Sequence, residues 1–245
     1  MNQTLTYAEL SLEQKSQYKN IVEDAFPKLI FQSSVVKTSW IKIEKYFPSF
    51  QRFLINEQNN ILGLINTIPF FWDHPLSKLP DQGWDWLVKK GIGDFENGIS
   101  PNHLGGLQII VAKSFLNKGI SKLLIAEGKK IMSEYKFRNF AIPIRPTFKS
   151  QYPEMAMDEY LNFKKEDKIF DPWIRTHLNS GAKVIKVCNN SMKISGRINF
   201  WKGIYKRETK QHNYWIVEGA LNPILIKPKQ DIGVYNEANI WIYYN

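Results

Sequence analysis

Apolar and polar positions follow two different periods along this chain, and each period predicts a type of element. Residues 11–25 place apolar side chains at helical spacing, with Ser11 as a candidate N-cap. Two apolar runs, 53–55 and 61–68, flank the Asn-rich segment 56–60, which is typical of a β-hairpin. The first third of the chain therefore predicts a helix followed by two paired strands.

The same patterns predict alternating strands and helices in the rest of the chain. Residues 107–111 form a short apolar run, residues 121–135 have helical spacing, and residues 139–144 are apolar again. Further elements are predicted as helices at 153–163 and 171–180, a strand at 184–187, and strands within 214–244 that are interrupted by Pro223 and Pro228. This order fits a mixed α/β fold.

The chain length suits one large domain or two small ones, without internal repeats or low-complexity linkers. The order of the elements favours one domain over residues 1–245. Residues 70–103 are rich in Trp, Pro, Asp and Gly. We expect an irregular, aromatic-rich region there that covers a pocket, with one short helix near 84–90. We also expect a strand-rich C-terminal extension at about 214–245.

The chain has a formal net charge of +10, so it should attract polyanions such as nucleic acid, a phosphorylated cofactor or an acidic partner protein. Its basic residues are dispersed, and no run of five or more lysines or arginines occurs. This dispersion argues against a nucleic-acid-binding protein.

Cysteine and histidine usage limits the possible chemistry. Cys188 is the single cysteine, which excludes an intrachain disulfide and a thiolate metal cluster. The four histidines have no metal-ligand spacing, so we expect no metal. The N-terminus lacks the features of a signal peptide, and no stretch approaches 18 apolar residues. We expect a soluble cytoplasmic protein without a membrane role.

The segment from the predicted strand at 107–111 to the helix at 121–135 has the form of a phosphate cradle. Free N–H groups at a helix start, together with the helix dipole, favour a bound anion. Gly119 allows a ligand to approach the backbone, and Ser121 can cap the helix or donate a hydrogen bond. Lys118 and Lys122 add positive charge. An ordinary strand-to-helix turn would have much the same sequence.

This segment resembles the acetyl-CoA motif of the GCN5-related N-acetyltransferase (GNAT) superfamily, V-x-x-x-x-[QR]-x-x-G-x-[GA], with Val111, Gly119 and Ser121 in register. Leu116 replaces the usual Gln or Arg, and Ser121 replaces the usual Gly or Ala. Further stretches resemble the GNAT-like domains of polyketide loading modules: Gly83-Trp84-Asp85-Trp86, Pro101-Asn102, 144–149, 170–177, Gly181-Ala182-Lys183, Asn190-Ser191-Met192 and 237–241.

The resemblance implies a mixed, splayed central sheet flanked by helices, with acetyl-CoA or another acyl-CoA as co-substrate. In this superfamily the pantetheine arm pairs with backbone groups between two diverging strands, much as an added strand would. The gap would lie between residues 109–111 and 140–142. The expected cofactor contacts are Ile109, Val111, Asn117, Lys118, Gly119, Ile120, Ser121 and Lys122.

His177 is the strongest candidate for the chemistry. It lies in a predicted helix with Asp171 as N-cap and Pro172 at the first position, and it shares a helix face with Trp173. A neutral imidazole can take a proton or donate a hydrogen bond to developing charge. Taken alone, such a histidine is more often a packing residue. The resemblance implies a catalytic His at this position that acts with a Thr.

Thr147 is the matching threonine, just after the end of a predicted strand. It could hold a thioester carbonyl or a malonyl carboxylate, or simply cap a turn. Arg145 and Arg175, with Trp173, are candidate substrate contacts, although surface salt bridges are the more common role for such arginines. Cys188 follows an apolar strand and is expected to be a half-buried, inert thiol.

The resemblance implies acyl transfer from CoA, and its polyketide-associated branch favours the phosphopantetheine thiol of an acidic acyl carrier protein as acceptor. Some such relatives are proposed to decarboxylate malonyl groups first. N-acyl transfer to a small-molecule amine is the alternative reaction. A GNAT-shaped module that binds CoA without turnover is a third reading, because Leu116 departs from the motif.

Overall fold

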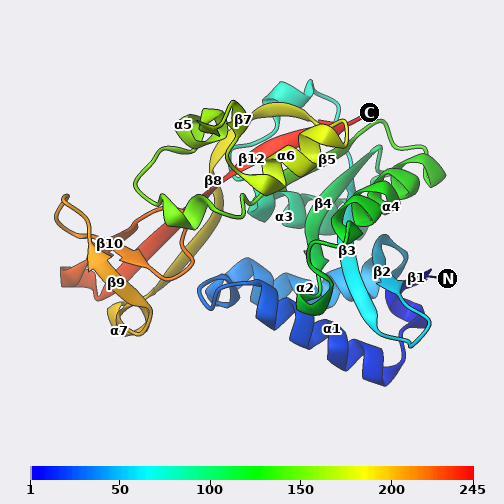
Figure 1. Ribbon diagram of the computed structural model, residues 1–245, viewed down its shortest axis with the longest axis horizontal. Coiled ribbons are helices and arrows are strands. Elements are labelled where there is room, and N and C mark those ends of the chain that lie inside the picture. Colours follow the sequence, from blue (N-terminus) through cyan, green and yellow to red (C-terminus); the bar gives the residue numbers. More distant parts are fainter. Residues whose placement is uncertain (1) are drawn as a thin grey trace.

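The computed structural model describes residues 2–245, and a ten-stranded sheet runs through this part of the chain (Figure 1). Its strand order is β1-β2-β3-β4-β5-β12-β11-β10-β9, and β8 also pairs with β12. The strands are β1 (Gln3–Thr6), β2 (Gln51–Ile55), β3 (Ile61–Phe70), β4 (His103–Val111), β5 (Phe140–Ile144), β8 (Lys183–Arg197), β9 (Tyr205–Glu208), β10 (Tyr214–Val217), β11 (Ile224–Lys227) and β12 (Ile232–Tyr244). A separate hairpin joins β6 (Lys164–Lys165) to β7 (Lys168–Ile169).

The central strands β4 and β5 diverge, as expected. They are parallel, and they pair at Leu104 with Phe140 and at Gly105 with Ala141. Beyond Gly105, β4 continues beside β3 alone, while the rest of β5 stays beside β12. The backbone groups that the two strands turn toward each other are therefore left without a sheet partner over the last part of both strands.

Helices cover both faces of the sheet. They are α1 (Leu12–Ala25), α2 (Ser34–Tyr46), α3 (Gly83–Glu96), α4 (Ile120–Glu134), α5 (Met157–Asn162), α6 (Pro172–Asn179) and α7 (Ile198–Lys202). Alternate residues of β12 divide between two apolar clusters. Trp241 packs in the cluster that includes α2 and α3, whereas Ile240 and Ile242 pack in the one that includes α4, α5 and α6. Figure 1 shows α1 and α2 together below β3 and β4.

Helix α4 packs against the sheet with Gly128 on its buried face, where there is no room for a side chain. A Cβ at this position would come within 2.5 Å of the Phe140 ring and 2.8 Å of Ile65. The buried residues Ile120, Leu124 and Ile131 then pack along the same face. This close contact fixes the start of α4 next to the end of β4.

Most predicted elements are confirmed, including α1 with its Ser11 cap, the hairpin β2–β3, α4, β5 and α6. Four predictions had the wrong length. The strand predicted at 107–111 is β4, which begins at His103, and the helix predicted at 153–163 is α5, which spans only Met157–Asn162. The predicted helix at 84–90 is α3, which continues to Glu96, so the expected irregular region is partly helical. The predicted strand at 184–187 is β8, which continues to Arg197 because its polar second half pairs with β12.

Helix α2 was not predicted at all. Its sequence is rich in β-branched residues, including Val35, Val36 and Ile43, which have modest helix propensity. Ser33 caps the helix by accepting a hydrogen bond from the amide of Val36. Val35 and Ile43 are buried in the cluster shared with α3. Tertiary packing therefore overrides the intrinsic preference of this segment.

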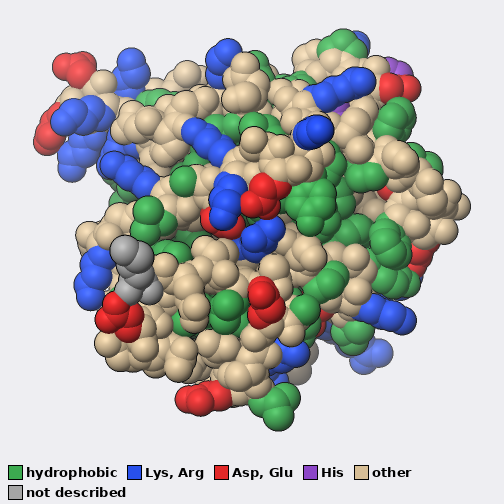
Figure 2. All heavy atoms as spheres, turned by 90° about the vertical axis from the view of Figure 1, so that its right-hand side faces the viewer, with side chains coloured by type: hydrophobic (Ala, Val, Ile, Leu, Met, Phe, Trp, Pro, Cys, Tyr) green, Lys and Arg blue, Asp and Glu red, His purple; other side chains and the backbone are tan. Residues whose placement is uncertain are grey.

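Charged side chains of both signs are interspersed on the face shown in Figure 2, without one continuous basic field. Arg52, on β2, lies 3.6 Å from Glu127 and 3.1 Å from Glu134, both on α4. Within residues 2–245, no helix has the length and apolar content needed to cross a bilayer.

Candidate active site

A cleft of about 1130 Å³ lies where β4 and β5 diverge. Its lining comes from β4 and β5, from the turn before α4, and from the helices α1, α2 and α6. Residues far apart in sequence therefore meet in one cavity. Its volume is slightly above the usual range of small-molecule and cofactor sites.

The turn between β4 and α4 presents free backbone amides. Asn117 and Gly119 both have positive φ, 61° and 76°, and Gly119 is the N-cap of α4. No backbone hydrogen bond within residues 2–245 uses the amides of Asn117, Lys118 or Gly119. A side chain at Gly119 would meet no described atom within 4 Å, so the backbone is open here. The turn has the form of an anion site at a helix start.

Most of the predicted cofactor residues line this cleft: Ile109, Val111, Asn117, Gly119, Ile120 and Ser121. Lys118 and Lys122 are exposed and are not part of its described lining. The ammonium of Lys118 instead lies 5.2 Å from the centre of the Phe115 ring. Ser121 does not cap the helix, because Gly119 occupies that position.

His177 lines the cleft from α6 and is fully buried. Its Nδ1 lies 2.7 Å from the hydroxyl of Tyr244, and its ring packs edge-on against Trp173 at 4.2 Å. Its Nε2 is buried and has no hydrogen-bond partner among the described residues. An unsatisfied buried nitrogen is costly, so its presence beside a cleft indicates a site that a ligand completes.

The surroundings of His177 keep its imidazole neutral. Burial lowers the pKa of His177 to about 3, from a usual value near 6.5. Burial also raises the pKa of the Tyr244 hydroxyl, which therefore stays protonated. When Tyr244 donates to Nδ1, Nε2 carries the hydrogen and is a free donor. When Nδ1 donates to Tyr244, Nε2 is the acceptor.

The buried neutral state of His177 has a measurable consequence for stability. Between pH 6.5 and 3 the unfolded chain binds a proton at this position that the folded protein does not, so stability falls as the pH falls. We expect the free energy of unfolding, measured in urea, to fall between pH 7.5 and pH 5 by about 2 kcal/mol more in wild type than in His177→Gln. The exposed His212 gives the control, since His212→Gln should keep the wild-type pH dependence. Identical curves for wild type and His177→Gln would contradict the assignment.

Asp171 connects the segment of Thr147 to the helix of His177. One carboxylate oxygen accepts from the amides of Trp173 and Ile174, which begins α6. The other accepts from the amide of Phe148 at 2.8 Å and from the hydroxyl of Tyr160 at 2.9 Å. Because Asp171 is fully buried, this link fixes Thr147, on the cleft wall, relative to His177.

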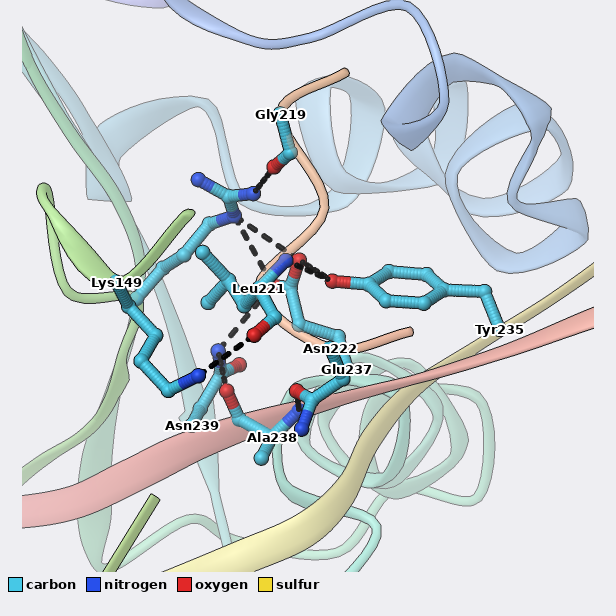
Figure 3. Close-up of polar contacts among 9 residues, drawn as sticks. Lys149, Gly219, Leu221, Asn222, Tyr235, Glu237, Ala238 and Asn239 are labelled. Atoms are coloured by element: carbon cyan, nitrogen blue, oxygen red, sulfur yellow. Dashed lines mark hydrogen bonds and ion pairs between the residues drawn. The ribbon is translucent and has the colours of Figure 1, made fainter. Parts of the chain in front are cut away.

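A buried ion pair lies at the end of β5. Arg145 donates from Nε to both carboxylate oxygens of Glu237, at 3.1 and 3.0 Å, and from a terminal nitrogen to the carbonyl of Gly219. Figure 3 shows Glu237 between Tyr235 and Asn239, which both donate to its carboxylate. Arg145, Glu237 and Asn239 line the cleft. The pair is not the surface salt bridge that the sequence suggested, because the Glu237 side chain is fully buried.

The other candidates lie as follows. Trp173 lines the cleft beside His177, whereas Arg175 is not in its described lining. The guanidinium of Arg175 donates to the backbone carbonyls of Ile169 and Phe170, so it makes no surface salt bridge within residues 2–245. Cys188 is fully rather than half buried, and burial raises its pKa to about 12, which keeps the thiol protonated.

Sequence reasoning assigned no role to several polar and aromatic residues of the cleft. Glu237 and Asn239 interrupt an apolar strand, and two polar side chains in a buried strand are a usable signal. Trp84 also lines the cleft and donates its indole N–H to the carbonyl of Leu107. Tyr7, Tyr18, Trp40 and Glu44 line the cleft as well, but no motif in the sequence marked them.

Comparisons with known proteins agree with this geometry. No protein-family model matches the chain. The arginine N-acetyltransferase avaD of Aspergillus versicolor is 25% identical over 247 residues, which cover 89% of this chain and 84% of that protein. The loading GNATL domain of CurA from Lyngbya majuscula superposes with a TM-score of 0.61 at 13% identity, covering 100% of this chain and 98% of that domain. The chain has the GNAT fold.

A second solved GNAT-fold structure is the GphF GNAT-like decarboxylase in complex with isobutyryl-CoA. It superposes with a TM-score of 0.60 at 11% identity and covers 100% of this chain and 98% of that chain. The predicted resemblance and the splayed sheet are thereby confirmed. The fold and the sequence match to an N-acetyltransferase together indicate an acyltransferase that uses a CoA thioester. Within residues 2–245, no group of three metal-ligating side chains is found.

Proposed function

We propose that this protein transfers an acetyl or other short acyl group from CoA to an amine nitrogen. The observation that carries the proposal is the unpaired, buried Nε2 of His177 in the same cleft as the free amides at Gly119. The sequence match to an N-acetyltransferase over most of the chain supports an amine as the acceptor.

Each part of the cleft has a role in this reaction. The amides of Asn117 to Ser121 would hold the pyrophosphate of CoA, and the diverging ends of β4 and β5 would pair with the pantetheine arm. The amine attacks the thioester carbonyl, a C–N bond forms, and the C–S bond breaks. The nitrogen loses a proton, and the departing thiolate takes one up.

His177 and Thr147 would act at the thioester carbonyl. An imidazole with a pKa near 3 is a weak base, so Nε2–H serves best as a donor to the oxygen that becomes negative in the transition state. In that tautomer the Tyr244 hydroxyl donates to Nδ1. Thr147 would add a second hydrogen bond from the opposite segment, held in place through Asp171.

Transfer to the phosphopantetheine thiol of a carrier protein is the second candidate. The superposition on the CurA loading domain over the whole chain favours it, and the GphF decarboxylase suggests malonyl-CoA as one donor to test. A module that binds CoA without turnover is the third, because the exposed Leu116 stands where the motif usually has Gln or Arg.

The acceptor can be identified by direct incubation. Acetyl-CoA, isobutyryl-CoA and malonyl-CoA are each incubated with the protein and either a set of small amines or a holo acyl carrier protein, and intact mass reports the products. We expect acylated amines and free CoA. A carrier protein that gains the acyl mass while the amines stay unchanged would favour the second candidate, and CoA binding without any product would favour the third.

Gly119→Val tests the site for CoA. The added side chain would fill the space that the backbone leaves open, and it would strain a position with φ of 76°. We expect acetyl-CoA affinity to fall by at least tenfold in calorimetry while circular dichroism stays unchanged. The exposed Gly98 also has positive φ and open space around it, so Gly98→Val is the matched control and should bind acetyl-CoA normally. If Gly119→Val binds acetyl-CoA as tightly as Gly98→Val does, the turn at Gly119 is not part of the CoA site.

A further inference from the structure

The side of the cleft opposite α6 carries a carboxylate among aromatic rings. Glu44, on α2, lines the cleft together with Tyr7, Tyr18 and Trp40. The hydroxyl of Tyr7 donates to the carboxylate of Glu44 at 2.9 Å. The indole N–H of Trp40, one helical turn before Glu44, donates to the hydroxyl of Tyr18 at 2.8 Å. These bonds hold the three aromatic side chains around Glu44.

Glu44 has no ion-pair partner within residues 2–245. No lysine, arginine or histidine nitrogen lies within 4 Å of its carboxylate, and the nearby Lys15 lies over the ring of Tyr7, 4.9 Å from its centre. Burial raises the pKa of Glu44, although hydrogen bonding with Tyr7, Trp40 and Tyr18 and the charge of Lys15 oppose this. A partly buried carboxylate without a counter-ion is costly, so a cation in the cleft would stabilise this arrangement.

The neighbouring rings favour the same kind of ligand. Tyr7 and Tyr18 meet edge to face with their centres 6.2 Å apart, and both line the cleft. The faces of Tyr and Trp rings attract ammonium and guanidinium groups, more strongly where water is excluded. The Glu44 carboxylate can pair with an organic cation through charge and through hydrogen bonds at once, with the aromatic side chains beside it.

We propose that Glu44, Tyr7, Tyr18 and Trp40 form a recognition site for a guanidinium or ammonium group of the acceptor. This proposal rests on the proposed function and extends it. The acceptor would carry a cationic group that is not acylated, held at α1 and α2, while its nucleophile reaches the thioester near His177. The acceptor is then a cationic amine, such as a basic amino acid or a diamine derivative.

Binding of two nearly isosteric probes tests the charge requirement without any turnover. L-Arginine and L-citrulline have the same carbon chain. Arginine ends in a cationic guanidinium group, whereas citrulline ends in a neutral urea group. Calorimetry with desulfo-CoA present should give arginine at least tenfold tighter binding than citrulline. The affinities of L-lysine and L-norleucine are compared in the same way, because lysine carries an ammonium group and norleucine carries no charge on its side chain. Equal affinities within both pairs, or no binding of any probe, would overturn the proposal.

Glu44→Gln tests the residue. Glutamine keeps an acceptor for the Tyr7 hydroxyl but removes the charge, so the preference for arginine over citrulline should fall to about twofold or less. Glu23, also on the cleft wall but exposed on α1, gives the matched control. Glu23→Gln should keep the wild-type preference. An unchanged preference in Glu44→Gln would overturn the assignment, and desulfo-CoA affinity reports the folding of each variant.

The two proposals can fail separately. If the probes show the expected charge preference but no acyl product forms with any amine, the cation site stands and N-acyl transfer is wrong. If neutral amines are acylated as fast as cationic ones, and Glu44→Gln leaves their KM unchanged, the transfer reaction stands and the cation site is wrong.

Discussion

Turnover should fall by about 10²-fold or more in His177→Ala, while acetyl-CoA affinity stays within a few-fold of wild type. Among residues 2–245, the imidazole of His177 is a buried group of the cleft whose Nε2 has no hydrogen-bond partner. The turn at Gly119 that would hold the phosphates belongs to a separate element. Single-turnover kinetics and calorimetry measure the two quantities separately. Thr147→Val should give a smaller loss, because one hydrogen bond to developing charge is removed.

Controls separate chemistry at His177 from packing. His103 is also buried, bonds to Asn102 through Nδ1, and is not in the described lining of the cleft. His103→Ala should keep turnover per folded molecule. His177→Gln retains an N–H donor and should recover part of the activity if His177 acts as a donor. Wild-type rates in both His177 variants would make His177 a packing residue.

Removal of Arg145 should destabilise the protein more than most single substitutions. Arg145→Met would leave the fully buried Glu237 carboxylate without its cation, and breaking a buried ion pair in this way costs about 3–5 kcal/mol. Urea unfolding measures the loss. The surface pair of Arg207 and Glu154 gives the matched control. Arg207→Met should lower the free energy of unfolding by at most about 1 kcal/mol.

A double variant tests the cause of this loss. Glu237→Gln carries no charge and keeps one acceptor oxygen, which can serve either Tyr235 or Asn239, the two donors to the carboxylate. In combination with Arg145→Met it should recover at least about 1 kcal/mol of the loss, because the buried charge is gone. If the double variant is as unstable as the sum of the two single variants, the ion pair is not the reason for the instability.

The segment formed by β4, the turn at Gly119 and α4 could be predicted from the sequence because each of its patterns is local. An apolar run, a glycine and a helical period occur within about thirty residues, and each element forms where its own pattern places it. Helix α6 was predicted for the same reason, since Asp171 and Pro172 mark its start. Helix α2 was missed because its helicity depends on Val35 and Ile43 packing against distant residues.

The candidate site was only half predictable, for a related reason. Val111, Gly119, Thr147 and His177 lie in stretches with a recognisable motif or resemblance, and all four line the cleft. Their assigned roles stay predictions. Glu44 and its aromatic neighbours come from a part of the chain without a motif. Only the packing of α1 and α2 against the sheet brings them to the cleft. The spacing of residues in the sequence does not predict this packing.

The two sides of the cleft come from different parts of the chain. The predicted acyl-handling residues lie between 107 and 177, whereas the cation site lies within the first 46 residues. Substitutions on α1 and α2 can therefore change the accepted molecule without moving the groups that act on the thioester. For protein engineering this separation is useful: a library confined to the N-terminal helices should yield altered acceptor preference at nearly constant acetyl-CoA affinity.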